Sequence, residues 1–278
     1  MELRQHALAA LCCADTTEKI QHVQRVAAQL AELPLDIDRV FQLADVQPPP
    51  MVWPGRPQRP HLIAPAQVST RSPFTLEGRA ALIHAICHIE FNAINLALDA
   101  VWRFVGMPRD FYLNWWQVAV EEAYHFGLLR DHLRTMPHPQ PGATWDYGDF
   151  DAHDGLWAMC EKTAHDITAR MALVPRTLEA RGLDATPIIQ AKLRKVNTPD
   201  ALQAVALLDI ILRDEVGHVA IGNHWYRWLC ERDGIDPVAH YGTLARQYDA
   251  PRLKPPFNDA ARRKAGFSQQ ELDYLLGA

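Results

Sequence analysis

The chain is poor in cysteine and carries no obvious signal for secretion or membrane insertion. Its 278 residues include five cysteines, an odd number without a Cys-x-x-Cys pair, which fits a reduced protein better than a disulfide scaffold. The first residues lack the apolar core of a signal peptide, and no apolar run approaches the ~20 residues of a membrane span. These absences predict a soluble, cytoplasmic protein that does not act with a membrane.

Other functional signatures are missing too. The net charge of −5 is modest and acidic, unlike the strongly basic footprint of a dedicated nucleic-acid binder, although a local basic patch stays open. There is no GxGxxG, P-loop or nucleophile elbow, so nucleotide and acyl-transfer chemistry lack support. No segment alternates like a strand and no repeat of fixed period occurs.

What the chain does contain is long helical periodicity interrupted by proline and glycine. We expect four long helices, over about 73–106, 108–136, 154–182 and 198–230, with a kink at Pro175 and a short continuation over about 186–195. For the last long helix, Thr198 is the expected N-cap and Pro199 the first helical residue.

The segments outside these helices are expected to be extensions. Residues 1–46 predict two short helices, the second over about 17–30, and residues 47–73 are a proline-rich wrap or linker rather than a partner-binding polyproline motif. Asp236-Pro237 and Ser268–Glu271 resemble the caps of two small C-terminal helices. The sequence therefore predicts an all-α protein: a four-helix bundle over 73–232 with extensions over 1–72 and 233–278.

Glu-x-x-His occurs twice, at Glu122–His125 and Glu215–His218, each time inside a long helical segment. Positions three, four and seven residues from Glu90, Glu122 and Glu215 are mostly apolar, so these carboxylates occupy the stripe that a bundle buries. An unpaired ionised carboxylate there would cost several kcal/mol or have its pKa raised. A bound cation is the natural remedy; three locally paired core acids are the alternative.

The height of each carboxylate in the bundle gives an independent test for the first hairpin. In an antiparallel helix hairpin, residues equally far from the turn lie at the same level. Residue 106 is midway between Glu90 and Glu122, and it is Gly106, the predicted turn.

The same argument selects the acid of the third helix. Residue 197 is midway between Glu179 and Glu215, and it directly precedes the Thr198 helix start. The competitor Glu161 has its midpoint with Glu215 at residue 188, inside a helical stretch. Glu179 is therefore preferred, with the reservation that Pro175 can shift its side chain.

Six residues are thus predicted to hold two metal ions: Glu90, Glu122, His125, Glu179, Glu215 and His218. Four carboxylates and two neutral imidazoles neutralise two divalent cations. Oxygen-rich ligation without thiolate favours iron or manganese over a structural zinc ion. His84 and His88, spaced four apart, are expected in hydrogen-bonded structural roles rather than in a second metal site.

Residues 77–82, 88–94, 178–184 and 214–222 carry a family resemblance. In them the chain resembles the ferritin-like di-iron carboxylate superfamily and looks most like an uncharacterised bacterial ferritin-like family of unknown function, over roughly residues 55–270. In the superfamily, an acid before the Glu of Glu-x-x-His often orients a ligand histidine on the facing helix. By that likeness Asp214 would orient His125 and Glu121 would orient His218. Leu129 stands where reductase subunits carry a radical tyrosine, so a stable radical of that kind is not expected.

The resemblance also implies a function. It suggests two iron ions, with manganese as the alternative, in an oxidoreductase or hydroxylase that activates dioxygen on an unknown organic substrate. Within the superfamily, tRNA-hydroxylating monooxygenases look like the nearest functional analogues. By this likeness we expect an unknown small-molecule or RNA substrate and an electron-donor protein. A homodimer is left open. The rival interpretations are a non-enzymatic iron-handling protein and a bundle whose metal site is vestigial or structural.

Overall fold

The computed structural model describes residues 1–46 and 52–277 and is all-helical over them, apart from turns and one isolated bridge. The chain forms two compact units, residues 1–157 and 158–278, and each is described by itself. Pro48, Pro49 and Pro50 of the proline-rich stretch lie outside the described residues.

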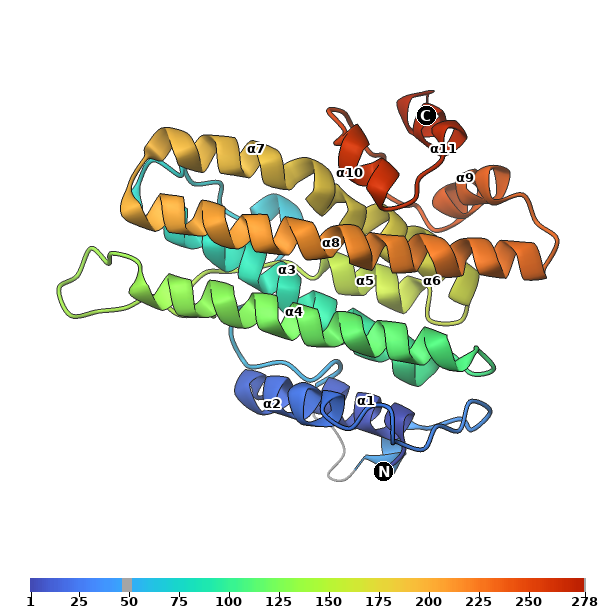
Figure 1. The fold of residues 1–278 in the computed structure, drawn as a ribbon. Helices are drawn as coiled ribbons and strands as arrows, with labels where there is room; N and C mark the ends of the chain where they lie inside the picture. The colour runs from blue at the N-terminus through green and yellow to red at the C-terminus, as the bar shows by residue number, and fades with distance from the viewer. Residues whose placement is uncertain (47–51, 278) are drawn as a thin grey trace. The chain divides into compact units, whose positions relative to one another are not determined.

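The first unit is built on a hairpin of two long helices, α3 (Leu76–Arg103) and α4 (Arg109–Thr135) (Figure 1). Thr75 caps α3, because its hydroxyl accepts a hydrogen bond from Gly78 N at 3.1 Å. Gly106 turns the chain between the helices with a φ of +72°, a conformation that glycine adopts without strain. The first two long helices predicted from the sequence, and the turn between them, are confirmed.

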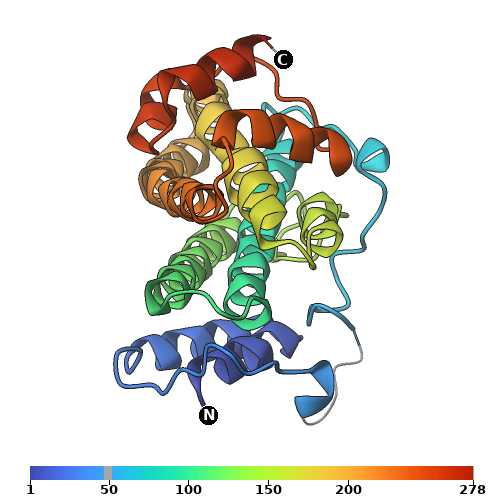
Figure 2. The ribbon, with the colours of Figure 1, turned by 90° about the vertical axis from the view of Figure 1, so that its right-hand side faces the viewer.

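Two N-terminal helices, α1 (Leu3–Cys12) and α2 (Thr16–Ala27), pack on this hairpin, α1 against α3 and α2 against α4 (Figure 2). Arg4 of α1 is completely buried and donates to the main-chain carbonyls of Asp36 at 2.9 Å and Trp102 at 2.7 Å. A buried guanidinium is tolerated only when its donors are satisfied, so Arg4 ties the N-terminus to the end of α3.

Lys19 of α2 is also completely buried. Its ammonium donates to the main-chain carbonyls of Gly55 at 2.8 Å and Leu11 at 3.4 Å, and to the side-chain oxygen of Asn95. A Cβ added to Gly55 would lie 2.2 Å from the Cys12 carbonyl oxygen, so only glycine lets this segment approach the Cys12 main chain so closely. One side chain thus joins α1, α2, α3 and the segment before α3.

The rest of that segment runs along the first unit with little regular structure. It contains two short 3₁₀ turns, η1 (Leu43–Asp45) and η2 (Pro65–Gln67). Main-chain bonds from Ile63 N to Ala152 O at 2.9 Å and from Ala152 N to His61 O at 3.0 Å form the isolated bridge. The described part of the proline-rich stretch is thus joined to the loop after α4 at this bridge.

A short helix, α5 (Gly155–Lys162), crosses the boundary between the units. The second unit then contains α6 (Ile167–Leu173), the π-helical turn η3 (Val174–Glu179), α7 (Ala180–Val196), α8 (Pro199–Arg232), α9 (Pro237–Gln247), α10 (Asp259–Lys264) and α11 (Gln269–Gly277).

The α7–α8 hairpin turns at Asn197, which has a φ of +56°, and α8 starts with Thr198 as N-cap and Pro199 as first residue. This helix start agrees with the sequence prediction.

The predicted third helix is wrong in its continuity. One helix was expected over 154–182, but the chain leaves helical geometry after Lys162, and α6 starts anew behind Asp166, whose carboxylate accepts from Ala169 N at 2.9 Å. The expected kink at Pro175 is present as a π-helical turn. Beyond it, α7 runs without a break to Val196, so the separate continuation over 186–195 is part of that helix.

The C-terminal segment contains three short helices where two were predicted. Asp236 caps α9, as expected from the sequence. Ser268 directly precedes α11, and its hydroxyl accepts from Glu271 N at 3.3 Å, as the sequence also predicts. The unexpected helix is α10, whose cap Asn258 accepts from Ala261 N at 3.2 Å. With six residues, α10 is too short to show helical periodicity in the sequence.

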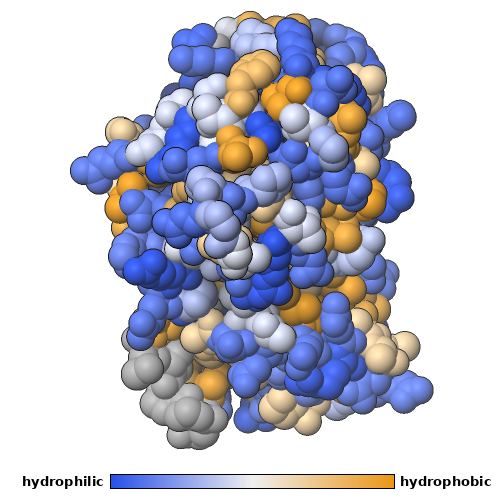
Figure 3. Space-filling model, turned by 90° about the vertical axis from the view of Figure 1, so that its left-hand side faces the viewer, coloured by the Kyte–Doolittle hydropathy of each residue, from blue (hydrophilic) through white to orange (hydrophobic). Residues whose placement is uncertain are grey.

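Among the described residues, one helix is long and apolar enough to cross a membrane by length and composition. That helix is α3, and 72% of its apolar window is buried inside the protein. A core helix of a soluble protein passes the same test. The face of the molecule drawn in Figure 3 is mostly hydrophilic, with small scattered apolar patches.

Candidate metal centre

The α3–α4 hairpin brings three of the predicted ligands together in the core of the first unit. Glu90 lies on α3, and Glu122 and His125 lie one turn apart on α4. Glu90 is 3% exposed, and the other two side chains are completely buried. Glu90 and Glu122 lie at the same level of the hairpin because they are equally far in sequence from the turn at Gly106, and His125 lies one turn further along α4.

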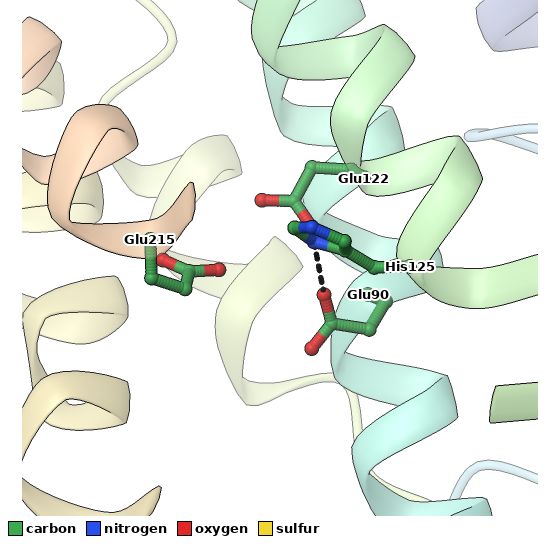
Figure 4. Close-up of side chains that lie close together, drawn as sticks. All are labelled: Glu90, Glu122, His125 and Glu215. Carbon is green, nitrogen blue, oxygen red and sulfur yellow. Dashed lines mark ion pairs between the residues drawn. The ribbon is translucent and has the colours of Figure 1, made fainter. Parts of the chain in front are cut away.

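The three side chains are within reach of a single ion. The His125 Nδ1 atom lies 3.3 Å from Glu90 Oε2 and 3.5 Å from Glu122 Oε2. One potential ligand atom from each residue lies within 4.8 Å of the others. Figure 4 shows the imidazole of His125 between the two carboxylates, with its ion pair to Glu90 dashed.

The electrostatics of this triad favour positive charge. Burial by itself lowers the pKa of His125, but its interactions with the Glu122 and Glu90 carboxylates outweigh burial and raise that pKa to about 11. Nearby, burial and the Glu90 charge raise the pKa of the Cys87 thiol well above its usual value. The carboxylates thus hold a proton on His125 when no metal ion is bound.

The second unit carries the other three predicted ligands. Glu215 and His218 lie one turn apart on α8, with His218 Nδ1 3.7 Å from Glu215 Oε1, and Figure 4 labels Glu215. Glu179 ends the π-helical turn. His218 is 1% and Glu179 8% exposed, and 12% of the Glu215 side chain is exposed. The competitor Glu161 is exposed on α5, which agrees with its rejection.

The two acids predicted to orient histidines have identified neighbours. Asp214 accepts from its neighbour Arg213 on α8, at 2.8 Å from Nε and 3.1 Å from Nη2. Glu121 accepts from Gln117 Nε2 at 2.7 Å on α4. The roles of Asp214 toward His125 and of Glu121 toward His218 stay predictions.

His84 and His88 have the structural roles expected for them. His84 Nε2 accepts from Gly148 N at 2.9 Å, and His88 Nδ1 lies 2.8 Å from the Tyr147 hydroxyl. Burial lowers the pKa of each imidazole to about 4, so both are neutral at pH 7. They hold the loop after α4 against α3.

Sequence reasoning missed Arg176, which lies in the π-helical turn and is 3% exposed. A basic residue directly after an apolar stretch that ends in Pro175 was the available signal. Its partners are described below.

The residues present fit a hard or borderline divalent cation. Carboxylate oxygens and imidazole nitrogens suit iron and manganese, and the described residues around the triad offer no thiolate that would favour a structural zinc ion, because Cys87 is kept protonated. The buried cluster is therefore able to bind a metal ion.

The fold and this cluster define an all-helical protein with a candidate metal site in its core. The chain belongs to a family described as "Protein of unknown function (DUF455)", which it matches over residues 12–273. An uncharacterized protein of Haemophilus influenzae is 50% identical over 226 residues, which cover 79% of this chain and 75% of that protein. No solved structure matches the chain significantly.

Proposed function

We propose that the protein is a ferritin-like di-iron carboxylate oxidoreductase, with manganese as the alternative metal. In this proposal the chain is a ferritin-like four-helix bundle whose six predicted ligands hold two ions. The observation that carries it is the buried triad of Glu90, Glu122 and His125. The second unit presents the same donor set, two glutamates and one histidine, largely buried on its own elements.

The chain's own residues would have three tasks. The four carboxylates neutralise the positive charge, and the buried aromatic rings beside the triad, those of Phe91 and Phe126, exclude water from it. His125 must release its proton before Nδ1 can bind a metal ion. Bound iron supplies the electrons for reducing dioxygen, chemistry that no side chain in the cluster provides.

Substrate and partners belong to the proposal. An oxygenase of this type takes electrons from a donor protein and oxidises an organic substrate, either a small molecule or an RNA, in the cytoplasm. The rival function is iron handling without catalysis.

Metal content and spectroscopy of the purified protein test the proposal. After anaerobic loading with Fe(II), we expect two iron ions per chain, and exposure to air should produce a near-ultraviolet absorption band. Glu122→Ala should abolish iron uptake. Glu161→Ala, which changes an exposed glutamate outside the cluster, should leave it unchanged.

Wild-type protein that takes up neither iron nor manganese contradicts the proposal. Iron uptake accompanied by a large cage-sized assembly in size-exclusion chromatography favours iron handling instead.

A further inference from the structure

The π-helical turn that ends in Glu179 is an irregular element held by many contacts. Pro175 has no N–H to donate to the helix, and the Thr177 hydroxyl donates to Ala172 O at 2.8 Å. The same hydroxyl lies 2.9 Å from the Tyr241 hydroxyl of α9. π-Helical turns are rare and occur often at functional sites.

The guanidinium of Arg176 is the centre of these contacts. It donates to Asn223 Oδ1 of α8 at 2.8 Å and pairs with Glu271 Oε1 of α11 at 2.9 Å. It also lies over three aromatic rings, with centroid distances of 4.8 to 5.1 Å: Tyr226, Tyr241 and Phe267. Such a cation, only 3% exposed, would be costly without a buried counter-ion, and Glu271 supplies it.

Glu271 is fixed in turn by two further donors, Ser268 before α11 and Arg227 of α8. It is 3% exposed, and its second oxygen accepts from Ser268 N at 2.6 Å and from Arg227 at 2.7 Å. Burial opposes its charge, but Arg176 and these donors keep the pKa of Glu271 below its usual value. The Glu271 carboxylate is therefore ionised at neutral pH.

The turn also rests on α8, the helix that carries Glu215 and His218. A Cβ added to Gly222, one turn after His218, would lie 2.5 Å from Pro175 Cβ. The turn therefore packs directly on α8, and Arg176 adds its hydrogen bond to Asn223 of the same helix.

We propose that Glu271 and Arg176 are positioning residues: through them the C-terminal helix α11 fixes the π-helical turn, and with it the metal ligand Glu179. The inference rests on the proposed function, because it takes Glu179 as a ligand. It assigns the C-terminal extension a part in metal binding, although that extension supplies none of the six ligands.

Metal titration of Glu271→Gln tests the inference. This variant keeps the side-chain shape and removes the charge that holds Arg176. With Co(II) as the probe and a competing chelator, we expect about a 10- to 100-fold weaker affinity, the usual effect of losing a residue that orients a ligand. The visible spectrum of bound Co(II) should change as well, which a general loss of stability would not cause.

Asp184→Asn is the matched control. Asp184 pairs with the buried Arg262 of α10 at 2.6 Å, in the same unit but on the regular helix α7. The Asp184→Asn variant should lower the melting temperature of the metal-free protein, as Glu271→Gln does. It should leave the Co(II) affinity and the Co(II) spectrum unchanged. If Glu271→Gln does not fold, Tyr241→Phe removes only the hydroxyl facing Thr177 and should shift both readouts in the same direction, by less.

The outcomes separate the two proposals. Wild-type protein that binds no Co(II) contradicts the proposed function and the inference with it. Wild-type binding together with unchanged affinity and spectrum in Glu271→Gln, or in Tyr241→Phe where that variant replaces it, overturns the inference alone. An equal loss of affinity in Asp184→Asn also overturns it.

Discussion

At the scale of single residues, His125 couples metal binding to protons. The neighbouring carboxylates raise the pKa of its imidazole to about 11, so it carries a proton at pH 7 in the metal-free protein. The raised pKa stabilises the metal-free fold below about pH 6.5, the ordinary histidine value, and this contribution is lost as the pH rises through 11. A metal ion at Nδ1 must displace that proton.

We therefore predict proton release when the metal-free protein binds Co(II) at pH 7, measured with an indicator dye in weak buffer. His125→Gln should release about one proton fewer per chain, if it still binds the ion. Equal proton release by both proteins would mean that His125 is neutral before binding.

Lys19 gives a second prediction at this scale. Burial lowers the pKa of its ammonium from the ordinary lysine value of 10.5 to about 7. Between these pH values the unfolded chain binds more protons than the folded chain, so the free energy of unfolding rises with pH. Lys19→Met removes this effect and leaves the carbonyls of Leu11 and Gly55 without their donor, at a cost of about 1–3 kcal/mol.

Denaturant unfolding at several pH values checks it. The stability difference between wild type and Lys19→Met should widen from pH 6 to pH 9. Lys192→Met, which changes an exposed lysine of α7, should differ little from wild type at any pH. A gap that narrows with pH contradicts the account of Lys19.

At the scale of elements, two glycines of α8 predict opposite effects. Gly217 has nothing within 4 Å of an added Cβ, so Gly217→Ala should stabilise the helix by up to about 1 kcal/mol. Gly222→Ala instead forces a methyl group against Pro175, and such overpacking costs about 1–3 kcal/mol. Melting temperatures should move in opposite directions; a rise in both would mean that the π-helical turn is not held against α8.

The helices also show how far a sequence can be read. Glu90 and Glu122 were placed at one height by counting from a turn, which works because α3 and α4 rise evenly on both sides of it. Such counting fails across 154–182, where Asp166 caps a new helix and Pro175 inserts a π-helical turn. Helical phase is lost there, so the environment of Glu179 depends on tertiary contacts with α8, α9 and α11 that no local pattern contains.

At the scale of the whole molecule, metal should stabilise the fold. An ion that binds only the folded chain at 100 times its dissociation constant adds about 2.7 kcal/mol. We expect the loaded protein to melt at a higher temperature than the chelated protein. Equal melting temperatures contradict this linkage.

Hydrogen exchange adds the location of the effect. If Glu215 and His218 bind the metal as well as the triad, metal binding should slow amide exchange both in α4 and in α8. Protection confined to α4 would indicate an ion held by Glu90, Glu122 and His125 alone.

The glycine turn between α3 and α4 has a consequence for chain length. One residue inserted between Glu90 and Gly106 would rotate that carboxylate by about 100° and slide it by about 1.5 Å along the helix. An insertion in the exposed loop over 137–142 would leave the triad where it is. Lengthening the chain is therefore predicted to leave the triad intact in the loop over 137–142 and to disrupt it between Glu90 and Gly106, so a graft or tag belongs in that loop.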